Sequence, residues 1–353
     1  MKKGKISESI LKRSVLKYIR TQREEIIKGA DIGSDCAFLK CVCGEEEPLL
    51  ENNVLAVSTQ TVSLPVRNAG SLSVYAAVNN LAAAGAEAFA VTVAVTLPEE
   101  ALEIQLQELM KQIENTCKVF GIQIAGGHTE VTDSVRTPVI TVTAVGKAGR
   151  QLPGQSFSQK EGSKRNPEDN RVSCNPENMD IVMTKWIGLE GTVILAKEKE
   201  KELLSRYPLP LITAAQGFEK YLPILPEAAT ARKSGVYMMH DVRNGGVFGA
   251  LWELSRSMGV GLSIDLKKIP VKQETIEICE FFDLNPYELL SGGCLLIVTA
   301  AGKELVKNLE REGISSAVIG RTAAGNDKVI LNDDETRFLE PAKPDEIFKV
   351  SFN

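Results

Sequence analysis

The chain has 353 residues, which is too long for one ordinary hydrophobic core and predicts two domains. Its hydrophobic fraction of 43% is typical of a globular protein, and its formal net charge of -5 argues against a general nucleic-acid binder, which needs a basic surface. No run of about 18 apolar residues occurs that would span a membrane. Seven cysteines without C-x-x-C spacing are typical of reduced thiols, so we expect a cytoplasmic protein with neither a nucleic-acid nor a membrane partner.

The first half of the chain alternates between strand and helix periodicity. Strands are predicted at 54–64, 89–97, 122–127 and 137–146, with helices at about 74–84 and 99–120. Strands interleaved with helices in this order predict an α+β fold in which the sheet is of the split βαβ kind.

A polar stretch at 150–178, rich in Pro, Gly, Ser and Asn, predicts a linker or a mobile loop. Beyond it, helices are predicted across 190–222 and at 246–258. Strands are predicted on both sides of them, at 180–186, 235–240, 259–266 and 294–300. We therefore expect two α+β domains, at 1–149 and 179–353, joined by the polar loop.

Two asparagines, Asn79 and Asn80, stand in the middle of an otherwise apolar helix that leads into an apolar strand. No face of this helix is polar enough to lie in water, so both amides are expected to be buried. Burying an unpaired amide costs on the order of a few kcal/mol. Each asparagine must therefore have a hydrogen-bond partner or a ligand.

Both histidines of the chain lie near glycine pairs. His128 follows Gly126 and Gly127, and His240 lies shortly before Gly245 and Gly246. Glycine pairs let a ligand approach the backbone closely, and the second pair opens a helix whose N-terminus favours anions. Both places suit a phosphate, but a structural histidine beside an ordinary turn is the alternative at each.

Two further stretches are candidate ligand sites. "GADIGSDCAFL" at 29–39 carries acids and glycines before a short strand, and "STQT" at 58–61 ends a strand with hydroxyls and one amide. Each is also compatible with an ordinary loop or strand end. The chain has no P-loop, no GxGxxG opening of a dinucleotide fold and no zinc-ligand spacing.

Taken in order, these stretches resemble the AIR synthase superfamily of ATP-binding enzymes, and within it the HypE-like group. The segments that carry the resemblance include "IGSDCA" at 32–37, "VSTQTV" at 57–62, "AVNNLAAAGAEA" at 77–88, "AGGHTEV" at 125–131, "HDVRNGG" at 240–246 and "LLSGGCLLIV" at 289–298. The resemblance implies a two-domain fold. Its N-terminal split-βαβ domain pairs with that of a second subunit into a β-barrel, which makes the protein a homodimer, and a C-terminal α+β domain packs beside it.

The resemblance also implies chemistry: ATP and Mg²⁺ as cofactors, and phosphoryl transfer to a small-molecule substrate. It implies that His128 and Asp241 are catalytic and that Asp35 and Glu130 bind the metal. The nucleotide-binding residues that it implies are Gly33, Ser34, Asp35, Gln60, Asn80, Gly126, Gly127, His128, Thr129, Gly245 and Gly246.

The chain departs from the pattern at three positions where the family has acids, namely Ser34, Gln60 and Asn80. An amide oxygen is a poorer magnesium ligand than a carboxylate, so we expect magnesium binding to be weak or lost. An amide can also donate, so Gln60 and Asn80 could bind phosphate oxygens directly. Arg243 stands where the family commonly has a small hydroxyl residue, and it is either a phosphate ligand or an exposed loop charge.

Three functions remain open from the sequence. The first is ATP-dependent phosphoryl transfer with a weakened magnesium site. The second is a non-catalytic, dimeric accessory or sensor protein that binds a nucleotide or another anion. The third is a structural dimer whose site has decayed. The chain ends in "FKVSFN" and lacks the C-terminal cysteine that HypE modifies, so we do not expect the HypE reaction on its own tail.

Overall fold

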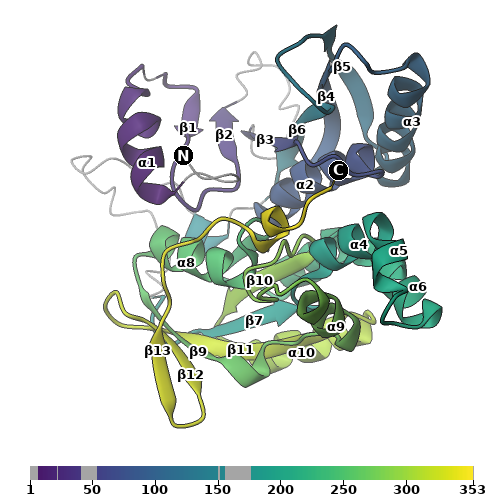
Figure 1. Ribbon diagram of the computed structural model, residues 1–353. Helices are drawn as coiled ribbons and strands as arrows, with labels where there is room; N and C mark the ends of the chain where they lie inside the picture. The colour runs from purple at the N-terminus through teal and green to yellow at the C-terminus, as the bar shows by residue number, and fades with distance from the viewer. Residues whose placement is uncertain (1–6, 22, 41–53, 150–151, 156–175, 353) are drawn as a thin grey trace.

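The computed structural model describes residues 7–21, 23–40, 54–149, 152–155 and 176–352. These residues form two α+β domains, one above the other in Figure 1, each built on one mixed sheet. The predicted two-domain α+β fold is thereby confirmed. Most of the polar stretch at 150–178 lies outside the described residues, as do Cys41, Cys43 and Cys174.

The N-terminal sheet has six strands in the order β1-β2-β3-β6-β4-β5. Strand β6 pairs antiparallel with both β3 and β4, so β3 and β4 are parallel strands separated by an inserted one, which is the predicted split βαβ arrangement. Helices α2 and α3 pack against this sheet. The elements are α1 (Glu8–Ser14), β1 (Ile26–Lys28), β2 (Ala37–Lys40), β3 (Val54–Val62), α2 (Ala69–Ala83), β4 (Ala86–Leu97), α3 (Glu103–Phe120), β5 (Gln123–Val131) and β6 (Val139–Ala148).

Strand β5 does not end at Gly127, where the glycine pair suggested a turn. It continues to Val131 because its parallel pairing with β4 continues as far as Leu97. The predicted end of this strand is therefore wrong by four residues, and His128 and Glu130 lie within a strand rather than on a turn.

The C-terminal sheet has seven strands in the order β13-β12-β9-β11-β7-β10-β8. Helices α7 and α10 pack on one face of it, and α4, α8 and α9 pack on the other. The strands are β7 (Asp180–Thr184), β8 (Met238–Val242), β9 (Gly261–Asp265), β10 (Cys294–Thr299), β11 (Ser316–Ala323), β12 (Lys328–Asn332) and β13 (Glu335–Phe338). The helices are α4 (Leu189–Glu198), α5 (Glu200–Leu203), α6 (Leu209–Gln216), α7 (Leu225–Lys233), α8 (Gly246–Met258), α9 (Gln273–Phe281) and α10 (Gly302–Arg311).

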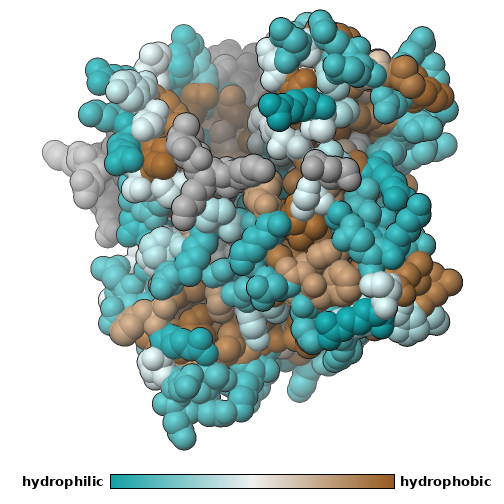
Figure 2. Space-filling view, in the orientation of Figure 1, coloured by the Kyte–Doolittle hydropathy of each residue, from teal (hydrophilic) through white to brown (hydrophobic). Residues whose placement is uncertain are grey.

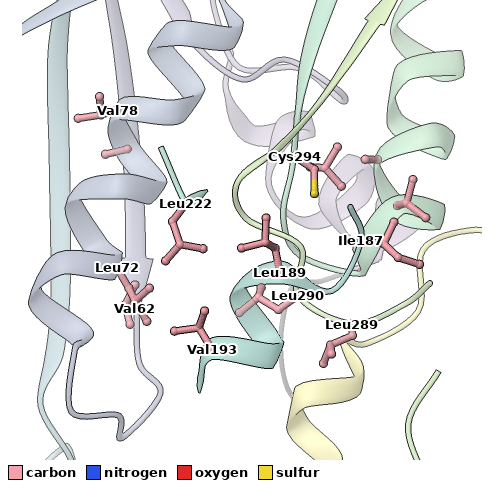
Figure 3. Close-up of a cluster of buried hydrophobic side chains, with 14 of the residues drawn as sticks. Val62, Leu72, Val78, Ile187, Leu189, Val193, Leu222, Leu289, Leu290 and Cys294 are labelled. Atoms are coloured by element: carbon pink, nitrogen blue, oxygen red, sulfur yellow. The ribbon is translucent and has the colours of Figure 1, made fainter. Parts of the chain in front are cut away.

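Helix α2 lies between the two domains and is buried along almost its whole length. It contacts β3, β4 and β6 of its own sheet, and it contacts β8 and α7 of the C-terminal domain. Figure 3 shows Leu72 and Val78 of this helix in one buried cluster with Leu222, Leu189 and Val193 of the C-terminal domain. The helix has no polar face because neither side of it meets water.

Asn79 joins the two domains through its side chain. Its Nδ2 donates to the carbonyl of Leu222 at 2.8 Å, and its Oδ1 accepts from the backbone N–H of Ile224 at 3.1 Å. All three residues are buried. One of the two asparagines in the apolar helix is therefore explained by an interdomain contact rather than by a ligand.

The surface in Figure 2 is hydrophilic over the β12–β13 hairpin, and hydrophobic residues gather near the middle of the same face. None of the described helices is long and apolar enough to cross a membrane. The four described cysteines, Cys36, Cys117, Cys279 and Cys294, are free and buried, as expected for reduced thiols.

Replacing Asn79 with Ala should destabilise the protein by about 2–3 kcal/mol, because two buried backbone groups lose their partners. Urea unfolding measures this free energy. The control is Gln107→Ala on the exposed side of α3, which should change it by less than about 0.5 kcal/mol. Equal stability of the two variants would contradict the interdomain role of Asn79.

Candidate functional site

A cleft of about 1110 Å³ lies between the two domains. Its walls are formed by α1, the loop at 29–37, the end of β3, the turn between β8 and α8, and the C-terminal segment at 341–352. Figure 1 shows this C-terminal segment running from β13 up to the N-terminal domain. The cleft brings together parts of the chain that are far apart in sequence.

The loop at 29–37 enters the cleft against helix α8. Gly33 has φ +70, and a Cβ there would lie 2.6 Å from the carbonyl oxygen of Glu253, so only glycine fits this position. Ser34 donates its hydroxyl to the carbonyl of Cys36 at 2.9 Å. These contacts place the next residue, Asp35, at the domain interface.

Asp35 forms an ion pair across this interface with His240 of β8. Its Oδ2 lies 3.0 Å from Nδ1 of His240, and the other ring nitrogen, Nε2, lies 3.4 Å from Oε2 of Glu253 on α8. The histidine is only 1% exposed. Burial by itself lowers the pKa of His240, but the negative charge of Asp35 and the interactions with Glu253 outweigh burial and raise it to about 10.

Asn80 holds the same loop from the side of α2. Its Nδ2 donates to Oγ of Ser58 at 3.0 Å and to the carbonyl oxygen of Asp35 at 3.4 Å. Ser58 in turn donates to that carbonyl at 3.1 Å, and the thiol of Cys36 donates to the carbonyl of Asn80 at 3.3 Å. The second asparagine of the apolar helix is therefore also explained, by its bonds to the loop that carries Asp35.

Asp241 lines the cleft next to this ion pair. It is 6% exposed, and its Oδ1 is buried with no hydrogen-bond partner among the residues that the structure describes. Burial raises its pKa to about 7, with a further contribution from the charge of Asp35, while Arg243 and His240 oppose the shift. A buried carboxylate oxygen without a partner can accept a hydrogen bond from a bound ligand.

The N-terminus of α8 is occupied by a carboxylate from the chain itself. Asp345 accepts hydrogen bonds from the N–H groups of Gly245 at 2.7 Å, Leu290 at 3.0 Å and Ile347 at 3.0 Å. Gly246, which also has a positive φ, packs closely against the backbone of Tyr287. The predicted preference of this helix end for an anion is therefore met by Asp345.

Arg243 lines the cleft and is not an exposed loop charge, which was one of the two alternatives that the sequence left open. Its guanidinium is bound by Glu190 of α4 through two bonds, from Nε at 3.0 Å and from Nη2 at 2.8 Å. The side chains are 11% and 3% exposed, so this is a buried bidentate ion pair.

The predicted residues on β5 lie away from the cleft of the same chain. Nε2 of His128 lies 3.5 Å from Oε2 of Glu130 on this edge strand, and the two side chains are 71% and 51% exposed. Gly126, Gly127 and Thr129 belong to the same strand and do not line the cleft. The structure thus brings together Gly33, Ser34, Asp35, Gln60, Asn80, Asp241 and Gly245, which all line the cleft, but it does not bring the β5 residues to them.

The donor groups around Asp35 do not fit the magnesium ion that the resemblance implies. Mg²⁺ takes oxygen ligands in a near-octahedral arrangement. Asp35 has one oxygen engaged by His240, Asn80 directs its NH₂ group at the loop, and Gln60 supplies an amide in place of a carboxylate. Among the described residues, no group of three or more His, Cys, Asp or Glu side chains is placed to hold a metal.

Sequence reasoning did not identify three residues of this site: Glu253, Asp345 and Glu190. Glu253 lies in an ordinary amphipathic helix, and Asp345 is 100 residues away from its partner Gly245. Their partners are set by tertiary packing, which no short motif encodes. His240 was singled out because of its glycine pair, but its contact with Asp35, 205 residues away, was not expected.

Known proteins resemble the chain over most of its length. The carbamoyl dehydratase HypE of Rhodobacter capsulatus is 26% identical over 74% of this chain and 72% of its own length. The thiamine-monophosphate kinase of Pyrococcus horikoshii is 25% identical over 87% and 88%. Among solved structures, HypE from a HypE–HypF complex has a TM-score of 0.69 at 17% identity, covering 94% of this chain and 99% of that one.

The family assignment extends over both domains. Residues 33–148 match the AIR synthase related protein, N-terminal domain, and residues 177–332 match the AIR synthase related protein, C-terminal domain. The first match begins at the loop that carries Asp35, and the second includes His240, Asp241 and Glu253. The chain therefore belongs to the AIR synthase related family, and it is HypE-like within it.

Proposed function

We propose that the protein binds ATP in the cleft between its two domains. Two structural neighbours support this proposal by their ligands: one is HypE in complex with ATP, and the other is a ThiL protein complexed with AMPPCP and TMP. The observation that carries the proposal is that Gly33, Gln60 and Asn80, which lie in the segment matching the family's N-terminal domain, all line one large cleft.

The role that the geometry supports best is that of a non-catalytic nucleotide-binding accessory or sensor protein. Phosphoryl transfer in ATP-using enzymes relies on metal ions that neutralise the charge developing on the phosphates. The donor groups around Asp35 do not fit such an ion, whereas Gly33 and the amide of Gln60 line the cleft. Binding can therefore persist without turnover.

Calorimetric titration with ATP tests this proposal when it is run in magnesium and again in EDTA. We expect binding in both buffers. Gln60→Trp should weaken it at least about ten-fold, because the larger side chain fills part of the cleft. Gln107→Trp, the same replacement on the exposed side of α3, is the control and should bind like the original chain. An unchanged affinity of Gln60→Trp would place the nucleotide elsewhere.

Phosphoryl transfer to a small substrate is the second candidate, and Asp241 favours it. A carboxyl group that lines a cleft and whose pKa is raised to about 7 has the properties of a general base. If the protein turns ATP over, Asp241→Asn should reduce phosphate release at least about a hundred-fold while changing ATP affinity little. Full activity of this variant would remove Asp241 from the reaction.

We propose that the protein is a homodimer formed through the N-terminal sheet. Strand β5 is at the edge of this sheet, and Val131 at its end is 62% exposed. Nine-residue edge strands of this kind readily pair with another chain. The open face of the sheet also carries Thr59 and His128. Light scattering that gave the mass of one 38.4 kDa chain would contradict the dimer.

A further inference from the structure

We propose that His240 takes the place of the divalent cation that Asp35 would otherwise bind, so that the cleft accepts a nucleotide unaccompanied by a metal ion. The part of this inference that concerns the nucleotide rests on the proposed function. The role of His240 follows from contacts within the chain and does not depend on nucleotide binding.

The first support is the position of the imidazole between two carboxylates. Nδ1 lies 3.0 Å from Oδ2 of Asp35, and Nε2 lies 3.4 Å from Oε2 of Glu253. Nδ1 is hydrogen-bonded to Asp35, whereas Nε2 has no hydrogen-bond partner among the described residues and meets the charge of Glu253 at 3.4 Å. A carboxylate facing each nitrogen favours the imidazole that carries both protons, which is a cation. The ring is 1% exposed, so solvent screens its charge little.

The second support is that the polar side chains beside Asp35 already donate hydrogen bonds within the chain. The NH₂ group of Asn80 bonds to Ser58 and to the carbonyl of Asp35, and the hydroxyl of Ser34 donates to Cys36. Ser34 and Asn80, two of the three residues at the family's acidic positions, therefore hold the loop by donating hydrogen bonds. A cation approaching this point would meet donors rather than additional anionic oxygens.

The third support is that the contact between Asp35 and His240 joins the two domains. Asp35 belongs to the N-terminal domain, and His240 and Glu253 lie on β8 and α8 of the C-terminal domain. The imidazole thus performs within the chain what a bridging ion would do: it neutralises carboxylates from two domains and holds them together. Glu8, another acid of the cleft, is likewise paired, with Arg256 at 3.1 Å.

Binding of Mn²⁺, a spectroscopic substitute for Mg²⁺, tests the role of His240 without nucleotide. Electron paramagnetic resonance measures free Mn²⁺ during titration of the full chain. We expect no site in the original protein below millimolar Mn²⁺. His240→Gln removes the cation paired with Asp35, next to the carboxylate of Asp241, so it should bind Mn²⁺ at least about ten-fold more tightly.

The control is Arg256→Gln, which removes a positive charge from the same helix, α8, without freeing Asp35. It should leave Mn²⁺ binding as weak as in the original chain. If it gains Mn²⁺ as His240→Gln does, net charge and not the position of the imidazole is responsible, and the inference fails. Asp35→Asn added to His240→Gln should abolish the gained site.

If circular dichroism shows that His240→Gln does not fold, His240→Lys is the replacement variant. It keeps a cation at this position, so it should fold and bind no Mn²⁺.

Two results would overturn the inference. One is tight Mn²⁺ binding by the original protein that Asp35→Asn abolishes, and the other is a folded His240→Gln that gains no Mn²⁺ site. Titration with ADP, once in EDTA and once in magnesium, tests the part of the inference that concerns the nucleotide. We expect the two ADP affinities to agree within about three-fold, and a larger gain of affinity in magnesium contradicts the inference. A protein that binds no nucleotide in either buffer would refute the proposed function, and the Mn²⁺ result would still decide the role of His240.

Discussion

The burial of helix α2 between two domains is the constraint on which the rest of the structure depends. A helix without a polar face must be covered on all sides, and here one side packs on the N-terminal sheet and the other on β8 and α7. Its two adjacent amides then point in different directions. Asn79 binds the C-terminal domain, and Asn80 binds the loop that carries Asp35. The same helix therefore fixes both the domain arrangement and one wall of the cleft.

Electrostatics in the cleft follow from this arrangement, because the closed interface buries charged groups that must be paired. His240 lies between Asp35 and Glu253, Arg243 is held by Glu190, and Asp345 accepts three backbone N–H groups. Each would be costly to bury alone. The chain thus supplies its own counter-charges in the cleft, and Asp241 keeps one buried oxygen without a hydrogen-bond partner among the described residues.

Periodicity and motif order predicted much of the fold, because the split βαβ unit depends on local patterns and on crossover rules. The gathering of Gly33, Gln60 and Asn80 was implied by the family resemblance, and in the structure all three line one cleft. Glu253 and Asp345 could not be predicted, because their partners lie far away in sequence. The strand through His128 was predicted too short because its pairing with β4 outweighs the turn tendency of two glycines.

The central claim, that a nucleotide enters this cleft while His240 stays on Asp35, is tested most directly by a crystal structure with ATP grown in magnesium. We expect nucleotide in the cleft, Nδ1 of His240 still about 3.0 Å from Oδ2 of Asp35, and no metal ion on that carboxylate. A magnesium ion bound to Asp35 with the imidazole displaced would contradict it.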